Sequence, residues 1–370
     1  MVKRRSRNKI IPEIKQNLTG RIPQIDLLKG IAIISVVILH TWQPAIFLLF
    51  GAPYHIYHAV PILILIAGFT GAYAYKMYGS TTFKQCYDPS LIIRRFKRLL
   101  TPYIIFWVIQ IILLVFILKN SFDESSLIMN FISGGSGLGA YFIPVIFQSV
   151  LIVPLFYILA QKNPDLMVVV ALILDIVFEV TMLFSGIPDR FYSVLYFRFI
   201  FAGALGVWLV MTPRRPVSWI AVGGLISLIY LTLSSYTNLF FSFSKFVGYD
   251  AVFHAPAYLW TLILVLTGLV LLPKNVKSLP FRWIERAGIA SWHIFLIQML
   301  YFLFVVQVVL NYIIFPLDKI LPVGDFYTIL LNLFGGFISV TFCCLVGYAW
   351  YIFENTWMHK KRAIANESHG

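Results

Sequence analysis

Long apolar runs alternate with short polar segments along the whole chain. Each run holds about 20 residues, the length that an α-helix needs to cross the hydrocarbon core of a bilayer. Lipid offers no hydrogen-bonding partner to an open strand edge, so the runs predict membrane-spanning helices. The sequence therefore predicts an all-α integral membrane protein, a bundle of about ten transmembrane helices. The predicted spans are 24–46, 58–77, 99–119, 139–160, 166–185, 192–211, 217–234, 252–273, 288–313 and 326–353.

The overall composition is that of a polytopic membrane protein. Hydrophobic residues make up 60% of the 370 positions, charged residues only 12%, and the mean hydropathy is +0.85. A soluble domain averages about 25% charged residues. The three cysteines predict no disulfide framework, because one lies in a basic loop and the other two are adjacent inside an apolar run.

The net charge of +14 is distributed unevenly between the two sides of the predicted bundle. With the N-terminus inside, 23 of the 29 lysines and arginines fall on the cytoplasmic side and four on the opposite side. The positive-inside rule predicts this bias for ten spans with both termini cytoplasmic, in a multi-pass protein of the cell membrane. We expect anionic membrane lipids, and not nucleic acid, as partners of the basic residues. The predicted organisation is a basic cytoplasmic tail over 1–23, a transmembrane domain over 24–353 and a second basic tail over 354–370.

The first predicted span carries three side chains that can hold a charge, Asp26, Lys29 and His40. A chargeable side chain inside a membrane segment is costly and by default indicates a functional site. Lys29 and His40 are eleven residues apart, so they share one helix face, roughly 16 Å apart along the axis. Asp26 lies one turn before Lys29 and within its reach. The pair indicates a polar track through an apolar wall; alternatively, Lys29 extends to the headgroups and His40 makes an interhelical hydrogen bond.

A second candidate site is the basic segment before the third span, where Arg95 and Arg98 are three residues apart. They share a helix face if the helix starts early. Two guanidinium groups can bind phosphate through paired hydrogen bonds. The alternative, which composition alone favours, is a basic cluster that holds the topology and contacts lipid phosphates.

The fifth span carries two carboxylates, Asp175 and Glu179, four residues apart and therefore on one helix face. Inside an apolar segment they should face a polar cavity or a cation. Arg198, at the start of the sixth span, is a candidate partner. A structural ion-pair cluster near the outer interface is an equally good interpretation.

Other motifs predict no chemistry. The glycine-rich stretch 133–139 lacks the strand-turn-helix setting and the Gly-Lys-Ser/Thr ending of a phosphate loop, so it predicts a mobile outer loop. His55 and His58 have no third ligand nearby and fit an aromatic interfacial belt. His254 and His293 are interpreted in the same way. We therefore expect no metal site.

Short motifs in a fixed order carry a family resemblance across nearly the whole chain. They are Asp26-Leu-Leu-Lys-Gly-Ile-Ala leading to His40, Val60-Pro-Ile-Leu-Ile-Leu-Ile-Ala-Gly-Phe69, Arg95-Phe-Lys-Arg98 followed by Leu-Leu-Thr-Pro-Tyr103, Tyr141-Phe-Ile143, Phe197-Arg-Phe-Ile-Phe-Ala-Gly203, Ile289-Ala-Ser-Trp-His-Ile-Phe-Leu-Ile-Gln298 and the late Glu354. In these segments the chain resembles the acyltransferase 3 family of integral-membrane O-acyltransferases. The resemblance rests on the order and spacing of the motifs, and it agrees with ten spans.

The resemblance implies transfer of a short acyl group, often acetyl, from acyl-CoA to a hydroxyl of a glycan or lipid-linked sugar. Acyl-CoA would be the donor substrate, and no cofactor is implied. His40 would be the general base, with Lys29 and Asp26 holding CoA or the catalytic track. Arg95 and Arg98 would bind the phosphates of CoA. Tyr141 would lie at the cavity wall and donate a hydrogen bond to the developing oxyanion.

Two positions depart from the family pattern. Lys29 stands where the family usually has arginine, and Gln298 stands where it has a late histidine. An amide can form hydrogen bonds but cannot take a proton at neutral pH. Two further functions therefore stay open, a catalytically silent scaffold and a transporter. In the transporter, Asp175, Glu179, Lys29 and His40 would form a proton or ion relay through a polar cavity, with Gln298 as a possible member of that cavity's wall.

Overall fold

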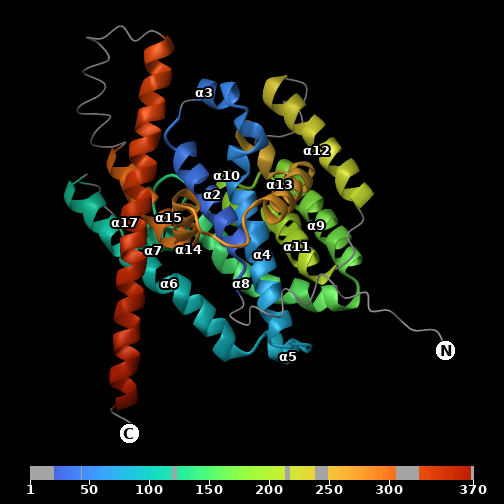
Figure 1. Cartoon of the computed structure of the whole chain (residues 1–370), viewed down its shortest axis with the longest axis horizontal. Helices are drawn as coiled ribbons and strands as arrows, with labels where there is room; N and C mark the ends of the chain where they lie inside the picture. Colours follow the sequence, from blue (N-terminus) through green and yellow to red (C-terminus); the bar gives the residue numbers. More distant parts are fainter. Residues whose placement is uncertain are drawn as a thin grey trace, which may run out of the picture.

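The computed structural model describes residues 21–42, 44–117, 119, 123–212, 217–237, 249–305 and 325–367. Over these ranges the chain forms helices joined by turns and contains no strand (Figure 1). The α-helices are α2 (Pro23–Leu39), α3 (Pro44–Leu49), α4 (Ala59–Met77), α5 (Phe83–Cys86), α6 (Pro89–Ile112), α7 (Glu124–Ile132), α8 (Phe142–Lys162), α9 (Pro164–Phe184), α10 (Asp189–Val194), α11 (Ile200–Met211), α12 (Val217–Tyr236), α13 (Tyr258–Leu271), α14 (Leu279–Ile289), α15 (Ser291–Phe304) and α17 (Asp325–Glu367).

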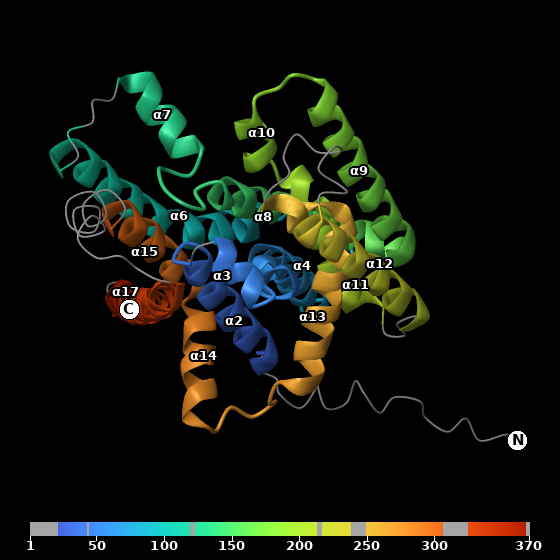
Figure 2. The same cartoon turned by 90° about the horizontal axis from the view of Figure 1, so that it is seen from above.

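Helices α2 and α4 form the centre of the bundle. In the view from above they lie in the middle, with α14, α15 and α17 on one side and α9, α11, α12 and α13 on the other (Figure 2). Helix α2 packs against α4, α14, α15 and α17, while α4 packs against α8 and α11. The first motif of the sequence is therefore surrounded by helices from the rest of the chain.

Glycines allow the central helices to approach one another closely. A Cβ on Gly30 of α2 would collide with the backbone carbonyl of Ile284 in α14, and a Cβ on Gly288 would collide with the carbonyl of Asp26. Between α4 and α11, a Cβ on Gly68 would collide with the carbonyl of Gly203. Without a strong hydrophobic drive between helices in lipid, such small-residue contacts are a main source of helix association.

The predicted class, an all-helical membrane protein, agrees with the structure. Among the described residues, six helices are long and apolar enough to cross a membrane, or up to seven if a bent helix pair is one span. Two shorter apolar helices, Tyr196–Met211 and Ala255–Leu271, accompany them. The count of ten spans, the cytoplasmic termini and the three-part division stay predictions. Most of the predicted N-terminal tail, residues 1–20, lies outside the described residues.

The first predicted span, 24–46, is wrong at its C-terminal end. Helix α2 ends at Leu39, His40 has φ −97° and ψ 0°, and α3 begins at Pro44. Proline disfavours the helical conformation in the residue before it and cannot donate a backbone hydrogen bond, so the helix does not continue through Pro44. As a consequence His40 lies at a helix end, beside the turns that lead into α4.

Three other boundaries also differ from the prediction. Helix α6 starts at Pro89, ten residues earlier than the predicted span, so Arg95 and Arg98 are both helical. The predicted span 288–313 contains a bend of 80° between α14 and α15. Helix α17 has 43 residues and continues through residue 353 to Glu367. At 1.5 Å per residue it is about 65 Å long, which exceeds the thickness of a bilayer core, about 30 Å.

Candidate functional site

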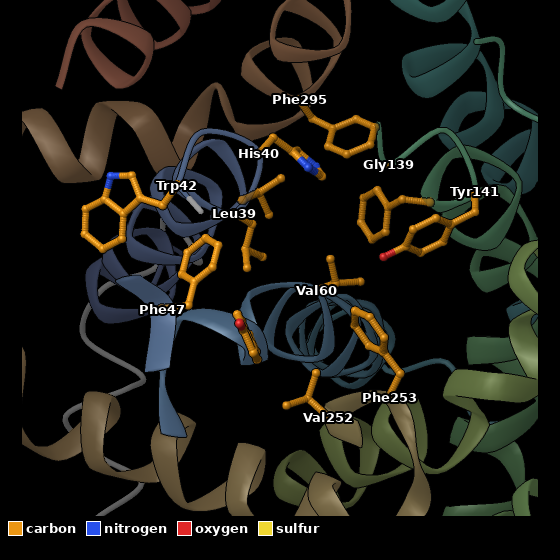
Figure 3. Close-up of a pocket in the computed structure, with 13 residues that line it drawn as sticks. Leu39, His40, Trp42, Phe47, Val60, Gly139, Tyr141, Val252, Phe253 and Phe295 are labelled. Atoms are coloured by element: carbon orange, nitrogen blue, oxygen red, sulfur yellow. The ribbon is translucent and has the colours of Figure 1, made fainter. Parts of the chain in front are cut away.

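A largely apolar cavity of about 340 Å³ lies beside the C-terminal end of α2. Its wall is formed by the C-terminal end of α2, α3, the short 3-10 helix Ile56–His58, α4, the loop before α8 with the start of α8, the 3-10 helix Tyr249–Phe253 and α15 (Figure 3). Most of the side chains that line it are aliphatic or aromatic. The lining residues are Val36, Leu39, His40, Trp42, Phe47, Tyr57, Val60, Gly139, Tyr141, Phe142, Val252, Phe253 and Phe295.

His40 contributes the imidazole of this cavity. It caps α2, where its backbone N–H donates to the carbonyl of Val37 at 3.3 Å. The ring of Phe302 packs against the imidazole with its centroid 5.7 Å away and an angle of 70° between the planes. Figure 3 shows the imidazole directed into the cavity on the side that Gly139 and Phe295 share. Because α2 ends at Leu39, His40 lies just beyond the last helical residue and its side chain can turn away from the helix axis.

Gly139 brings the loop before α8 against His40. Its φ of +85° lies in the left-handed region that favours glycine. A Cβ added here would lie 3.6 Å from Nε2 of His40 and 3.4 Å from the ring of Phe295. The backbone therefore passes close to the imidazole, and glycine is the residue that permits this path without strain.

Hydrogen bonds connect this glycine-rich loop to α6, α7 and α15; its mobility and its position on the outer side stay predictions. The buried side-chain amide of Gln110 binds both the N–H and the carbonyl of Ser136. Asn130 donates to the Ser136 hydroxyl at 2.7 Å. Gln298, fully buried in α15, donates to the carbonyl of Leu138 at 3.3 Å. Gln298 thus supports the loop beside His40.

Tyr141 brings a hydroxyl to the same cavity. It precedes the first turn of α8, and Figure 3 shows its oxygen pointing into the cavity. Behind it lies the guanidinium of Arg198, 5.7 Å from the Tyr141 ring centroid and 4.5 Å from that of Phe253. A cation over an aromatic face is an attractive arrangement. Arg198 therefore packs on the rings that form this part of the wall.

The two carboxylates of α9 belong to a separate polar cluster behind this wall. Asp175 is buried and accepts from the backbone N–H of Phe201 at 3.3 Å. Glu179 pairs with His254 at 2.9 Å. Arg198 lies close enough to Asp175 to interact with it electrostatically. The predicted link to Arg198 agrees with this arrangement, but neither carboxylate lines the cavity.

Lys29 and Asp26 form an ion pair at the opposite end of α2. The Lys29 ammonium lies 2.6 Å from Asp26, which also pairs with Arg21 at 2.5 Å. The Asp26 side chain is only 8% exposed. Lys29 does not line the cavity, so the structure joins it to Asp26 and does not bring it to His40.

Arg95 and Arg98 lie on α6, away from the cavity lining. Arg95 is half-buried, donates to the Tyr75 hydroxyl at 2.8 Å and lies 4.4 Å over the same ring. Arg98 is exposed one turn further along. One guanidinium is thus fixed in direction while the other extends to the surface, an arrangement that suits binding of an external phosphate.

Sequence reasoning missed two contacts of buried histidines. His293 of α15 lies 2.7 Å from Glu354 of α17, and His254 pairs with Glu179. The partners are 61 and 75 residues apart in sequence, so no local spacing indicates them. Within the described part of the chain, no group of three or more histidines, cysteines, aspartates or glutamates could hold a metal ion.

Comparison with known proteins identifies the family. Residues 22–348 match the acyltransferase domain of the acyltransferase 3 family. No curated protein and no solved structure matches the chain. The match covers most of the 370 residues and includes every segment that lines the cavity. This multi-pass membrane protein therefore belongs to the acyltransferase 3 family.

Proposed function

We propose that the protein transfers a short acyl group from acyl-CoA to a hydroxyl of a glycan or glycolipid, with His40 as general base. The observation that carries this proposal is the position of His40, whose imidazole faces the same apolar cavity as the Tyr141 hydroxyl. Imidazole is the side chain whose ordinary pKa allows it to exchange protons near neutral pH. Membership of the family supports acyl transfer as the class of reaction.

The proposed reaction is one displacement at the thioester carbonyl. His40 accepts the proton of the acceptor hydroxyl while its oxygen forms a bond to the carbonyl carbon. The carbon–sulfur bond then breaks, and the proton returns from the imidazolium to the departing thiolate, giving an ester and free CoA. Tyr141 points into the same cavity and would donate a hydrogen bond to the carbonyl oxygen as it gains negative charge.

The donor would bind with its phosphates at the cytoplasmic side. Tyr75 already holds the Arg95 side chain in one orientation, so less conformational entropy is lost when Arg95 binds a phosphate. Arg98 is exposed one turn further along α6. Lys29 supplies a positive charge at the inner end of α2, balanced by Asp26. We place the protein in the cell membrane, with acyl-CoA, a sugar acceptor and lipids as partners and with no bound cofactor.

A relay of protons or ions is a weaker candidate. Lys29 is paired with Asp26, Glu179 is paired with His254, and neither Lys29 nor the carboxylates of α9 line the cavity. A scaffold without catalysis would account for Gln298, but this amide has a role in holding the loop at Leu138. Both alternatives predict that no acyl group is transferred.

The proposal is tested with radiolabelled acetyl-CoA in membranes that contain the protein. We expect label in a glycan or glycolipid fraction, and loss of about 10² to 10⁴ of the rate in His40→Ala, the usual contribution of a general base. His55→Ala is the matched control, because His55 is an exposed histidine outside the cavity. Label transfer that is unchanged in folded His40→Ala protein would contradict the assignment of the base.

A further inference from the structure

The residues that line the cavity divide into two groups, which define a polar end and an apolar end. His40, Gly139, Phe295 and Tyr141 lie along one side of it, and Phe47, Val60 and Val252 lie along the other (Figure 3). The polar groups that the proposed reaction uses are thus gathered at one end. The rest of the lining consists of aliphatic side chains and aromatic rings, with the phenol of Tyr57 among them.

Aromatic packing continues this apolar end and leaves few polar atoms facing inward. The ring of Phe47 packs against Trp42, with centroids 5.8 Å apart, and against Tyr57, with centroids 5.4 Å apart. The indole nitrogen of Trp42 faces α17, because a Cβ on Gly336 would collide with it. Figure 3 shows this nitrogen on the side away from the other labelled side chains. Trp42 therefore presents its hydrocarbon surface to the cavity.

The apolar lining determines whether a sugar ring or a hydrocarbon chain binds at this end of the cavity. A sugar ring carries several hydroxyl groups, and each one buried without a hydrogen bond costs about 1–3 kcal/mol of binding free energy. A hydrocarbon chain has no such requirement and gains from each methylene removed from water. The apolar end therefore fits the acyl chain of the donor and not the sugar of the acceptor.

The volume gives the length of chain that the cavity accommodates. A water molecule occupies about 30 Å³ in the liquid, and a methylene group likewise has one non-hydrogen atom, so 340 Å³ accommodates about ten such groups. An acetyl group has three non-hydrogen atoms and would leave most of this space unfilled. Unfilled apolar space forfeits packing contacts, so the fit improves as the chain lengthens.

The thioester sulfur and the attacking hydroxyl must share this space for about ten groups. We propose that the donor carries a medium-length aliphatic acyl chain of about six to eight carbons, with its carbonyl beside His40 and its tail between Phe47, Val60 and Val252. This inference rests on the proposed function, because it takes the cavity as the place where the thioester reacts. It replaces acetyl as the preferred group and leaves the reaction itself unchanged.

The test is direct binding of S-ethyl, S-butyl, S-hexyl and S-octyl thioethers of CoA, which cannot transfer an acyl group, to the full-length protein in detergent by calorimetry. We expect Kd to fall about fourfold for each added methylene up to S-hexyl, the factor that corresponds to burying one CH₂. A Kd that is unchanged or rises along the series would overturn the inference.

Cavity variants separate binding in the cavity from partition of the ligand into detergent. Val252→Phe fills the apolar end, so it should weaken S-hexyl-CoA at least tenfold and leave S-ethyl-CoA unchanged. Val270→Phe on α13 is the matched control, since Val270 is 78% exposed and outside the cavity. Val252→Ala, which enlarges the space, should shift the optimum toward S-octyl-CoA. Equal weakening of both ligands by Val252→Phe would also overturn the inference.

The outcomes distinguish this inference from the proposed function. Clear binding of every thioether with no dependence on chain length refutes the long acyl chain alone. Absence of binding for all of them, together with no transfer of label from acetyl-CoA, refutes both.

Discussion

Replacing Gly139 by alanine tests whether the loop before α8 sets the geometry around His40. Gly139 has φ +85°, and a Cβ there would lie 3.6 Å from Nε2 of His40. Left-handed backbone costs an L-residue other than glycine about 1–2 kcal/mol. The new methyl group itself meets its neighbours at ordinary van der Waals distances, so the backbone is the main source of strain.

Hydrogen bonds restrain the loop, so the strain from Gly139→Ala should displace the backbone next to His40 and lower kcat. Gln110 and Asn130 hold Ser136, and Gln298 holds Leu138, by hydrogen bonds that are each worth about 1 kcal/mol. Together they exceed the backbone strain, so the loop stays attached while its segment next to His40 shifts. If the whole strain of about 1–2 kcal/mol is added to the activation free energy, kcat falls by about 5- to 30-fold.

The assay compares transfer of labelled acyl groups and thermal unfolding in detergent for wild type, Gly139→Ala and Gly186→Ala. Gly186 has φ +64° with no neighbour within 4 Å, so its alanine variant carries a similar backbone strain away from the cavity. We expect a similar, small loss of thermal stability in both variants and a loss of kcat in Gly139→Ala alone. Wild-type kcat in Gly139→Ala, or an equal loss in Gly186→Ala, would refute the role of this loop.

Three further perturbations address the groups around the site. Arg95→Ala should raise KM for acetyl-CoA with kcat recovered at saturating donor, while Arg94→Ala, an exposed neighbour on α6, should leave KM unchanged; steady-state kinetics distinguish the two. Asp26→Asn should lower the free energy of unfolding of the detergent-solubilised protein by about 2 kcal/mol, because Lys29 and Arg21 both lose their ion pair with this buried carboxylate, whereas Arg21→Gln, at a side chain that is 50% exposed, should have an effect below about 1 kcal/mol. Arg198→Lys keeps the charge but loses the planar contact with the rings of the wall, so kcat should fall about 3- to 30-fold with the donor KM unchanged; equal changes in both would contradict a positioning role.

Local pattern in the sequence was enough to predict the class of fold and part of the site. Apolar runs of bilayer length locate the helices because burial in lipid imposes their length and hydrophobicity. The three-residue spacing of Asp26 and Lys29 predicts an ion pair, and the structure contains it at 2.6 Å. The end of α2 also had a signal, since Pro44 follows His40 by four residues and stops a continuous helix.

Long-range packing could not be read from the same patterns. The contact of His293 with Glu354 joins residues that are far apart in the sequence, and so does that of His254 with Glu179. The hydrogen bonds from Gln110 to Ser136 depend on the path of a loop in which four glycines have positive φ. Glycine permits many paths, so the residue pattern could not predict which tertiary contacts this loop makes.

The most direct test of the central claim is to measure donor binding and acyl transfer together in His40→Gln. Glutamine keeps hydrogen-bonding capacity at the end of α2 but cannot accept a proton at neutral pH. If His40 is the general base, Kd for acetyl-CoA should stay within about twofold of wild type while transfer of label falls about 10²- to 10⁴-fold. Transfer at the wild-type rate, or a loss explained entirely by weaker donor binding, would contradict the account.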